Sequence, residues 1–374
     1  MKKQFITLIT IALMTASCHN STKLTSGIDL KNLDTTAVPG TDFYQYACGG
    51  WMKNHPLTGE YSRFGSFDML RENNLKQLND LVTGIAKKGG SEGSIEQKIS
   101  DLYNIAMDSV KLNKDGFTPI KADLDKIAAL KTKDELLALM PDLYLSGLDT
   151  YFTVYVDADA KNSKQNLVQT YQSGISLDER EYYLDNDAHT KEIRDKYKTH
   201  VVKMFELVGF TQTDAQKAME AVLKIETRLA TAAYDNVKLR DPQTNYNKMT
   251  VADLQKLVPE INWSNYLKAL GLKDTKEVSV SQKESLIEVG KIIGTEPIQN
   301  QIAYLQWKLI DDAAAYLSDE IYAEHFNFYG KVLSGKQEQR PRWKRAVDNV
   351  DGALGEAVGQ MYVKQYFPPE AKER

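Results

Sequence analysis

The chain has 374 residues, of which 42% are hydrophobic and 26% are charged. This composition is typical of a soluble globular protein, and the length is sufficient for one large core or for two lobes. The formal net charge is -4. Because nucleic-acid binding normally requires a basic face, we expect no nucleic-acid partner.

The N-terminus has the pattern of a secretory signal. Two lysines precede a mostly apolar run at residues 5–16, which is too short to cross a bilayer as a helix. We therefore predict a signal peptide at residues 1–17. The run closes with Thr15-Ala-Ser-Cys18, which resembles a bacterial lipobox, although Thr15 stands where that motif usually has leucine.

We predict that Cys18 is lipidated and that residues 18–40 form a flexible tether. The protein would then be exported and lipid-anchored to a bacterial membrane, on its periplasmic side or at the cell surface. The alternative is an ordinary signal-peptidase site at which Cys18 is incidental.

If Cys18 is lipidated, Cys48 is the only other cysteine, so an internal disulfide cannot form. We interpret Cys48 as a small buried thiol beside a Gly-Gly pair rather than as a nucleophile.

Most of the chain after Phe67 has helical periodicity. One apolar stripe predicts a first long helix with a buried face, and its members are Phe67, Leu70, Leu75, Leu78 and Val82. Proline at a first turn and capping residues predict further helix starts, at Thr118-Pro119, Thr132 with Glu135, Thr213 with Gln216, and Thr250. The β-branched and aromatic run at residues 151–156 predicts a short strand. The expected fold class is mainly α with a minor β element.

The sequence contains no catalytic or metal-binding pattern that we recognise. A zinc-protease helix needs two histidines four residues apart with a glutamate beside the first. None of the five histidines has that arrangement, and paired cysteines, a nucleophile elbow, a P-loop and a dinucleotide fingerprint are all missing. We predict no catalytic residue and no metal ligand in this chain. Each histidine is interpreted as a surface or half-buried polar residue.

Two arginines suggest recognition of an anion. Arg63 lies in a turn and Arg71 in the first turns of the helix that follows, and a guanidinium can bind a carboxylate through two parallel hydrogen bonds. The alternative is that Arg71 pairs with Asp68 while Arg63 is solvated. A second basic segment at residues 340–345 is interpreted as the first turn of a helix, with Trp343 in the core and the charges in water.

Several segments resemble the neprilysin family, which comprises the neprilysin and endothelin-converting-enzyme type zinc metallopeptidases. The matching segments occur in order along the chain from about residue 41 onward: Phe43-Tyr-Gln-Tyr-Ala-Cys-Gly-Gly-Trp51, Arg63-Phe-Gly-Ser-Phe-Asp-Met-Leu-Arg71, Gly174-Ile-Ser-Leu-Asp-Glu-Arg-Glu-Tyr-Tyr-Leu184, Arg240-Asp-Pro-Gln-Thr-Asn-Tyr-Asn-Lys-Met-Thr250, Phe326-Asn-Phe-Tyr329, Arg342-Trp343 and Gly355-Glu-Ala-Val-Gly-Gln-Met-Tyr-Val363.

The resemblance implies a two-lobed, mainly helical fold around a cavity, with residues 41–374 as the N-terminal peptidase domain. It implies that Arg63 and Arg71 bind the backbone or the C-terminal carboxylate of a peptide. Residues 41–85 and 352–374 would pack toward a catalytic lobe that is largely missing here, together with its zinc helix. We expect no cofactor in this chain, and zinc in the full-length enzyme.

Two functions remain open. In the first, the chain is the substrate-binding portion of a membrane-anchored zinc endopeptidase, whose partners are short peptides and a C-terminal catalytic domain; alone it would cleave nothing. In the second, it is a non-catalytic lipoprotein that binds peptides or proteins. The run Phe367-Pro-Pro-Glu370 begins a helix with only four residues left. This favours a chain cut from a longer protein.

Overall fold

The computed structural model describes residues 27–373, so Cys18 and the predicted signal peptide lie outside the described residues. The described residues divide into two compact units, the first ending at Thr58 and the second beginning at Gly59. The boundary that we expected after residue 40 stays a prediction.

The first unit contains a single turn of 3-10 helix, η1 (Leu30–Asn32), and the helix α2 (Phe43–Asn54). Asp42 caps α2, because its side chain accepts a hydrogen bond from the backbone N–H of Gln45. A Cβ atom at Gly50 would lie 2.3 Å from the carbonyl oxygen of Lys31. The glycine is therefore needed for the close contact between α2 and the η1 segment. Cys48 is half-buried rather than fully buried.

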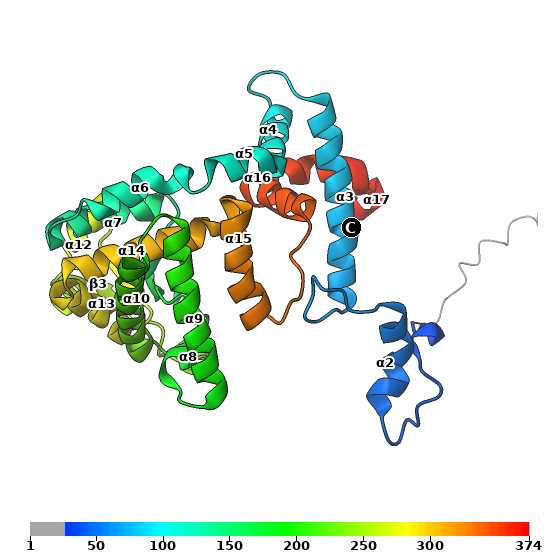
Figure 1. Ribbon diagram of the computed structural model, residues 1–374, viewed down its shortest axis with the longest axis horizontal. Helices are drawn as coiled ribbons and strands as arrows, with labels where there is room; N and C mark the ends of the chain where they lie inside the picture. The colour runs from blue at the N-terminus through cyan, green and yellow to red at the C-terminus, as the bar shows by residue number, and fades with distance from the viewer. Residues whose placement is uncertain (1–26, 374) are drawn as a thin grey trace, which may run out of the picture. The chain divides into compact units, whose positions relative to one another are not determined.

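The second unit is mainly helical, which confirms the predicted fold class (Figure 1). Its helices are α3 (Ser66–Lys88), α4 (Ile95–Met107), α5 (Ser109–Asp115), α6 (Thr118–Ala128), α7 (Lys133–Leu145), α8 (Glu181–Leu184), α9 (Ala188–Leu207), α10 (Gln212–Ala232), α11 (Val251–Leu257), α12 (Trp263–Ala269), α13 (Lys283–Thr295), α14 (Ile298–Ala313), α15 (Asp319–His325), α16 (Arg342–Tyr366) and α17 (Pro369–Glu373). Shorter helical segments are η2 (Lys238–Arg240), η3 (Ala314–Tyr316) and the π-helical η4 (Phe326–Leu333).

A four-stranded sheet is the minor β element, in the order β1-β2-β4-β3. The strands are β1 (Phe152–Asp159), β2 (Asn162–Gln172), β3 (Lys248–Thr250) and β4 (Glu277–Val280). The first two form an antiparallel hairpin that pairs Phe152 with Gln172. β2 runs parallel to β4, with Val168 opposite Val278. The strand predicted near residues 151–156 is thus confirmed, whereas the other three strands were not predicted.

Most of the predicted helix starts are confirmed. Thr132 and Glu135 form a reciprocal capping box at α7, and Thr250 caps α11. The start predicted at Thr213 was wrong by two residues. Thr211 is the capping residue of α10, because its side chain accepts the backbone N–H of Asp214.

Three hydrophobic cores hold the second unit together. The first surrounds the sheet and contains the fully buried Trp263, and the second lies among α9, α10, α14 and η4 around the fully buried Trp307. The third joins α3, α4 and α16, which lie beside one another in Figure 1. Burial of apolar area of this extent is the main stabilising contribution to such helix packing. The third core holds α3, the helix that carries the predicted binding residue Arg71.

The stripe predicted on α3 is only partly buried. Its later members Leu75, Leu78 and Val82 belong to the third core. Phe67 and Leu70 were expected to be buried with them, but they are 86% and 58% exposed. That part of the prediction was wrong, because the buried apolar residues of α3 begin only at Leu75.

Candidate functional site

The turn that carries Arg63 leads directly into α3. Gly65 precedes the helix in an extended conformation, and its backbone N–H donates to the Asp68 carboxylate at 2.9 Å. A carboxylate in the first turn is also favoured by the helix dipole. Asp68 therefore acts as a helix-capping residue. The alternative in which it pairs with Arg71 was wrong, since no such ion pair is present.

Arg63 and Arg71 both have exposed side chains. Within residues 27–373, neither guanidinium makes an ion pair or a hydrogen bond. The apolar side chains of Phe67 and Leu70 are exposed on the same first turns of α3 as Arg71, at the spacing that puts residues on one helix face. This face combines guanidinium donors with apolar surface. Such a surface suits a ligand that has both a carboxylate and apolar side chains.

A buried lysine fixes the backbone around these arginines. Lys344 of α16 is only 6% exposed. Its ammonium group lies 2.8 Å from a carboxylate oxygen of Glu60 and 2.8 Å from both carboxylate oxygens of Glu72. Glu60 lies on the N-terminal side of Arg63 in the turn, and Glu72 follows Arg71 in α3. One cation thus ties the turn and the helix to α16.

Tyr61 completes this network. Its hydroxyl donates a hydrogen bond to Glu72, and its ring packs edge-on against Phe64 at 5.1 Å between centroids. Burial and the hydrogen bond to Glu72 raise the pKa of Tyr61. Burial alone would raise the pKa of Glu72, but the hydrogen bonds from Lys344 and Tyr61 lower it below its ordinary value. At neutral pH the network therefore holds an ionised carboxylate.

The start of the turn is held by backbone hydrogen bonds. The carbonyl oxygen of Gly59 accepts the N–H groups of Gln337 and Glu338, both at 2.9 Å. A Cβ atom at Gly59 would lie 2.7 Å from the Glu338 side chain. The turn is therefore fixed at Gly59, at Glu60 and at Gly65, and Arg63 lies between these fixed points.

The basic segment at residues 340–345 differs from our expectation. Its charges were expected to stay in water, but Arg340 pairs with Asp348, Arg342 pairs with Asp319, and Lys344 is buried in the network described above. The expectation for Trp343 is confirmed in part, because the ring packs against the third core while remaining partly exposed. Sequence spacing shows a cluster of like charges but not the acidic residues that neutralise it.

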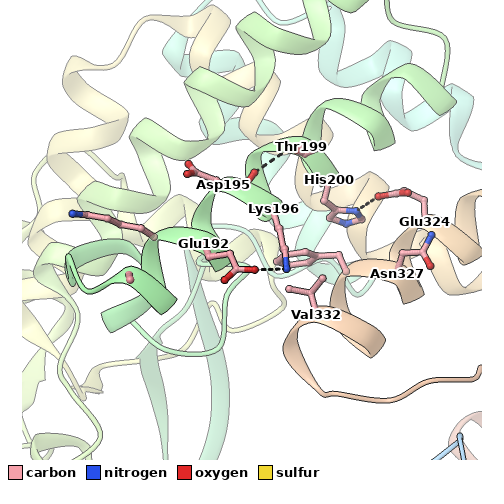
Figure 2. A pocket seen from close by; sticks show the side chains of 11 residues that line it. Glu192, Asp195, Lys196, Thr199, His200, Glu324, Asn327 and Val332 are labelled. Carbon is pink, nitrogen blue, oxygen red and sulfur yellow. Dashed lines mark hydrogen bonds and ion pairs between the residues drawn. The ribbon is translucent and has the colours of Figure 1, made fainter.

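The histidines form no catalytic arrangement in the described residues. His200 was expected at or near the surface, but it is 2% exposed, and its Nδ1 lies 2.9 Å from a carboxylate oxygen of Glu324. This pair borders a cavity of about 660 Å³ between α9 and the α15–η4 segment. Figure 2 shows His200 facing Glu324, while Glu192 pairs with Lys196 along α9. Two pairs of lining residues, Glu192 with Lys196 and His200 with Glu324, neutralise each other, and we interpret the cavity as structural.

A buried carboxylate that the sequence analysis missed lies in the second core region. Glu226 of α10 is fully buried and accepts hydrogen bonds from Ser176 at 2.6 Å, Tyr197 at 2.7 Å and Tyr183 at 3.1 Å. Burial raises its pKa to about 7, against the opposing effect of Lys308 and of these three hydroxyls. Ser176 and Tyr183 belong to the segment 174–184. Glu226 therefore anchors that segment to α10.

No metal site is formed by residues 27–373, since no three His, Cys, Asp or Glu side chains come together there. These residues do not fit a zinc ion. In the same range, no helix is long and apolar enough to cross a membrane.

Comparisons with known proteins cover nearly the whole chain. The profile of Peptidase family M13 matches residues 39–374. Endothelin-converting enzyme 1 of Rattus norvegicus is 30% identical over 362 residues, which cover 93% of this chain and 47% of that protein. Endothelin-converting enzyme 1 of Homo sapiens is also 30% identical over 362 residues, with 93% and 46% covered.

Solved structures agree with this result. The zinc metalloprotease Zmp1 of Mycobacterium tuberculosis, in complex with an inhibitor, matches with a TM-score of 0.87 and 33% identity, over 91% of this chain and 52% of that one. PepO of Lactobacillus rhamnosis shares the fold, with a TM-score of 0.76 and 22% identity over 90% and 53%. This chain spans about half the length of these relatives.

Proposed function

Because this chain belongs to peptidase family M13, we propose that it forms the N-terminal, substrate-binding portion of a zinc metalloendopeptidase that hydrolyses short peptides. A zinc ion in that enzyme would supply Lewis-acid chemistry. Since the described residues do not fit zinc, its ligands would belong to another part of the natural protein.

The observation that carries the proposal is the pair of exposed guanidinium groups at Arg63 and Arg71, which have no partner within residues 27–373. They lie on a turn and a helix that Lys344 fixes in place. A fixed backbone lowers the conformational entropy that is lost when these side chains bind a carboxylate. We assign to these two arginines the binding of the C-terminal carboxylate, or of the backbone, of a peptide substrate.

Two segments have exposed apolar residues, which supports the binding of another protein domain there. Phe67 and Leu70 of α3 are exposed, as are Val363 of α16 and Phe367 after it. Apolar surface of this kind is often covered by another protein surface. We propose that residues 41–85 and 352–374 pack against the C-terminal catalytic domain.

The experiment that tests the proposed activity uses the natural protein purified from its source cells. We expect a species much larger than the 42.2 kDa of this chain, whose hydrolysis of short peptides is abolished by a chelator and restored by zinc. A pure species at the mass of this chain that binds peptides but does not cleave them would contradict the enzyme proposal. It would support the alternative of a non-catalytic binding lipoprotein.

Export and lipid anchoring through Cys18 are a separate part of the proposal, and the sequence pattern at residues 1–18 supports them. We expect the wild-type protein in the membrane fraction of bacterial cells and the Cys18→Ser variant in the soluble exported fraction. A Cys48→Ser variant is the matched control and should stay with the membrane. Equal partition of wild-type and Cys18→Ser protein would contradict lipidation at Cys18.

A further inference from the structure

A second group of arginines borders a cavity of about 720 Å³ in the second unit. The cavity lies among α4, α5, η3, α15 and α16, and Arg63 and Arg71 do not line it. Its size is within the range of small-molecule pockets, roughly 300–1,000 Å³. Arg340, Arg342 and Arg345 line it together with Asp348.

The charges around this cavity do not balance. Arg340 pairs with Asp348, and Arg342 pairs with Asp319. Arg345 has no carboxylate partner among residues 27–373; its Nε donates to the carbonyl oxygen of Arg340 at 3.3 Å. Its guanidinium lies 4.2 Å from the centroid of the Tyr322 ring. One positive charge is therefore left over.

Two observations indicate that donors at this cavity lack an acceptor. The Nη2 atom of Arg340 is buried and makes no hydrogen bond within residues 27–373. Arg345 is half-buried, and burial together with the nearby Arg342 and Arg340 lowers its pKa against the opposing effect of Tyr322 and Asp319. Buried donors without an acceptor are costly. A bound oxyanion would give Arg345 an acceptor.

The remainder of the lining is apolar. Leu102, Ile105 and Ala106 of α4 form one wall, and the Tyr316 side chain, 59% exposed, lies at the cavity as well. Aliphatic and aromatic walls of this kind favour an organic body over a free inorganic ion.

We propose that this cavity binds a small molecule that carries an oxyanion group on an apolar body. The guanidinium group of Arg345 binds the oxyanion, and the α4 wall with Tyr316 covers the body. The oxyanion is a carboxylate or a phosphate ester, both of which a guanidinium binds through two oxygens. The site does not include the arginines of the proposed peptide site, so either proposal can be wrong while the other is correct.

Calorimetric titration of the purified protein at low ionic strength tests the proposal. The probes are 4-phenylbutanoate, phenyl phosphate and, as a cation of similar shape, 4-phenylbutylamine. We expect both anions to bind more tightly than the amine, with affinity that falls as salt rises. The tighter of the two anions identifies the oxyanion. Equal binding of anion and amine, or no binding of either anion, would overturn the proposal.

Two variants with opposite expected effects keep the test independent of folding. Arg345→Gln should weaken anion binding roughly tenfold or more, because it removes the unpaired guanidinium. Asp348→Asn should tighten it, because it removes the negative charge of a carboxylate that lines the cavity, and a merely destabilised protein would not bind more tightly. Arg240→Gln is the matched control, because Arg240 is exposed and does not line the cavity, and it should bind as wild type. Unchanged affinity in Arg345→Gln, or weaker binding in Asp348→Asn, would also overturn the proposal.

Discussion

The ammonium group of Lys344 lies 2.8 Å from both carboxylate oxygens of Glu72. These residues are 272 positions apart in the chain, and their contact joins α16 to the first turns of α3. Glu72 directly follows Arg71, and the same ammonium group contacts Glu60 in the turn that carries Arg63. The position of both candidate binding residues therefore depends on one buried cation.

Replacing Lys344 by methionine tests this dependence. The substitution keeps the length of the side chain but leaves Glu60 and Glu72 partly buried without their cation. We expect the free energy of unfolding to fall by about 3 kcal/mol, as when one partner of a buried ion pair is removed. The measurement is urea unfolding.

The exposed Lys76 of α3 is the matched control for Lys344. It makes no ion pair within residues 27–373, so Lys76→Met should change the free energy of unfolding by less than about 0.5 kcal/mol. Equal effects of the two substitutions would contradict the central position of Lys344 in the network.

The buried Glu226 predicts a pH dependence. Its pKa is about 7 in the folded protein and 4.5 as the ordinary value, so the folded state holds the proton more tightly than the unfolded state. The stability contributed by the neutral carboxyl is fully present below pH 4.5 and is lost as pH rises through 7. The loss is about 3 kcal/mol for a shift of this size.

Glu226→Gln removes this titration and keeps an acceptor for the surrounding hydroxyls. We expect the variant to gain stability relative to wild type by about 3 kcal/mol between about pH 4.5 and about pH 8. Urea unfolding of both proteins at the two pH values measures the difference. A difference between variant and wild type that does not change with pH would show that Glu226 is already ionised in the folded protein.

Gly50 predicts a steric effect in the first unit. A Cβ atom there would meet the backbone of Lys31 at 2.3 Å, so Gly50→Ala should separate η1 from α2. We expect faster proteolysis within residues 27–58 in the variant. Gly84→Ala is the comparison, since nothing lies within 4 Å of its added Cβ, and alanine there should stabilise α3 by about 1 kcal/mol. Unchanged proteolysis in Gly50→Ala would contradict the close contact.

Local signals in the sequence predicted local structure well. The capping box of Thr132 and Glu135, the cap at Thr250 and the strand near residue 152 depend on neighbouring residues, and all three are present. Burial depends on distant segments. Phe67 and Leu70 have the spacing of core residues, yet they are exposed because the third core begins at Leu75.

The candidate site was predictable only in part. The residues Arg63 and Arg71 were identified from their motif. Lys344, which positions them, was not identified, because it is one of four charged residues in a basic segment. Its partners Glu60 and Glu72 are more than 270 positions away. Glu226 gave no signal either, because a glutamate within a helical pattern normally faces water.

The measurement that tests the central claim most directly is a comparison of peptides with a free and an amidated C-terminus. In the natural protein, Arg71→Gln and Arg63→Gln should raise the KM for the free-carboxylate peptide roughly tenfold, with little change in the free energy of unfolding. The KM for the amidated peptide should change much less, and Lys76→Gln should match wild type with both peptides. An unchanged KM for the free-carboxylate peptide in both arginine variants would contradict the assignment of Arg63 and Arg71 as substrate-binding residues.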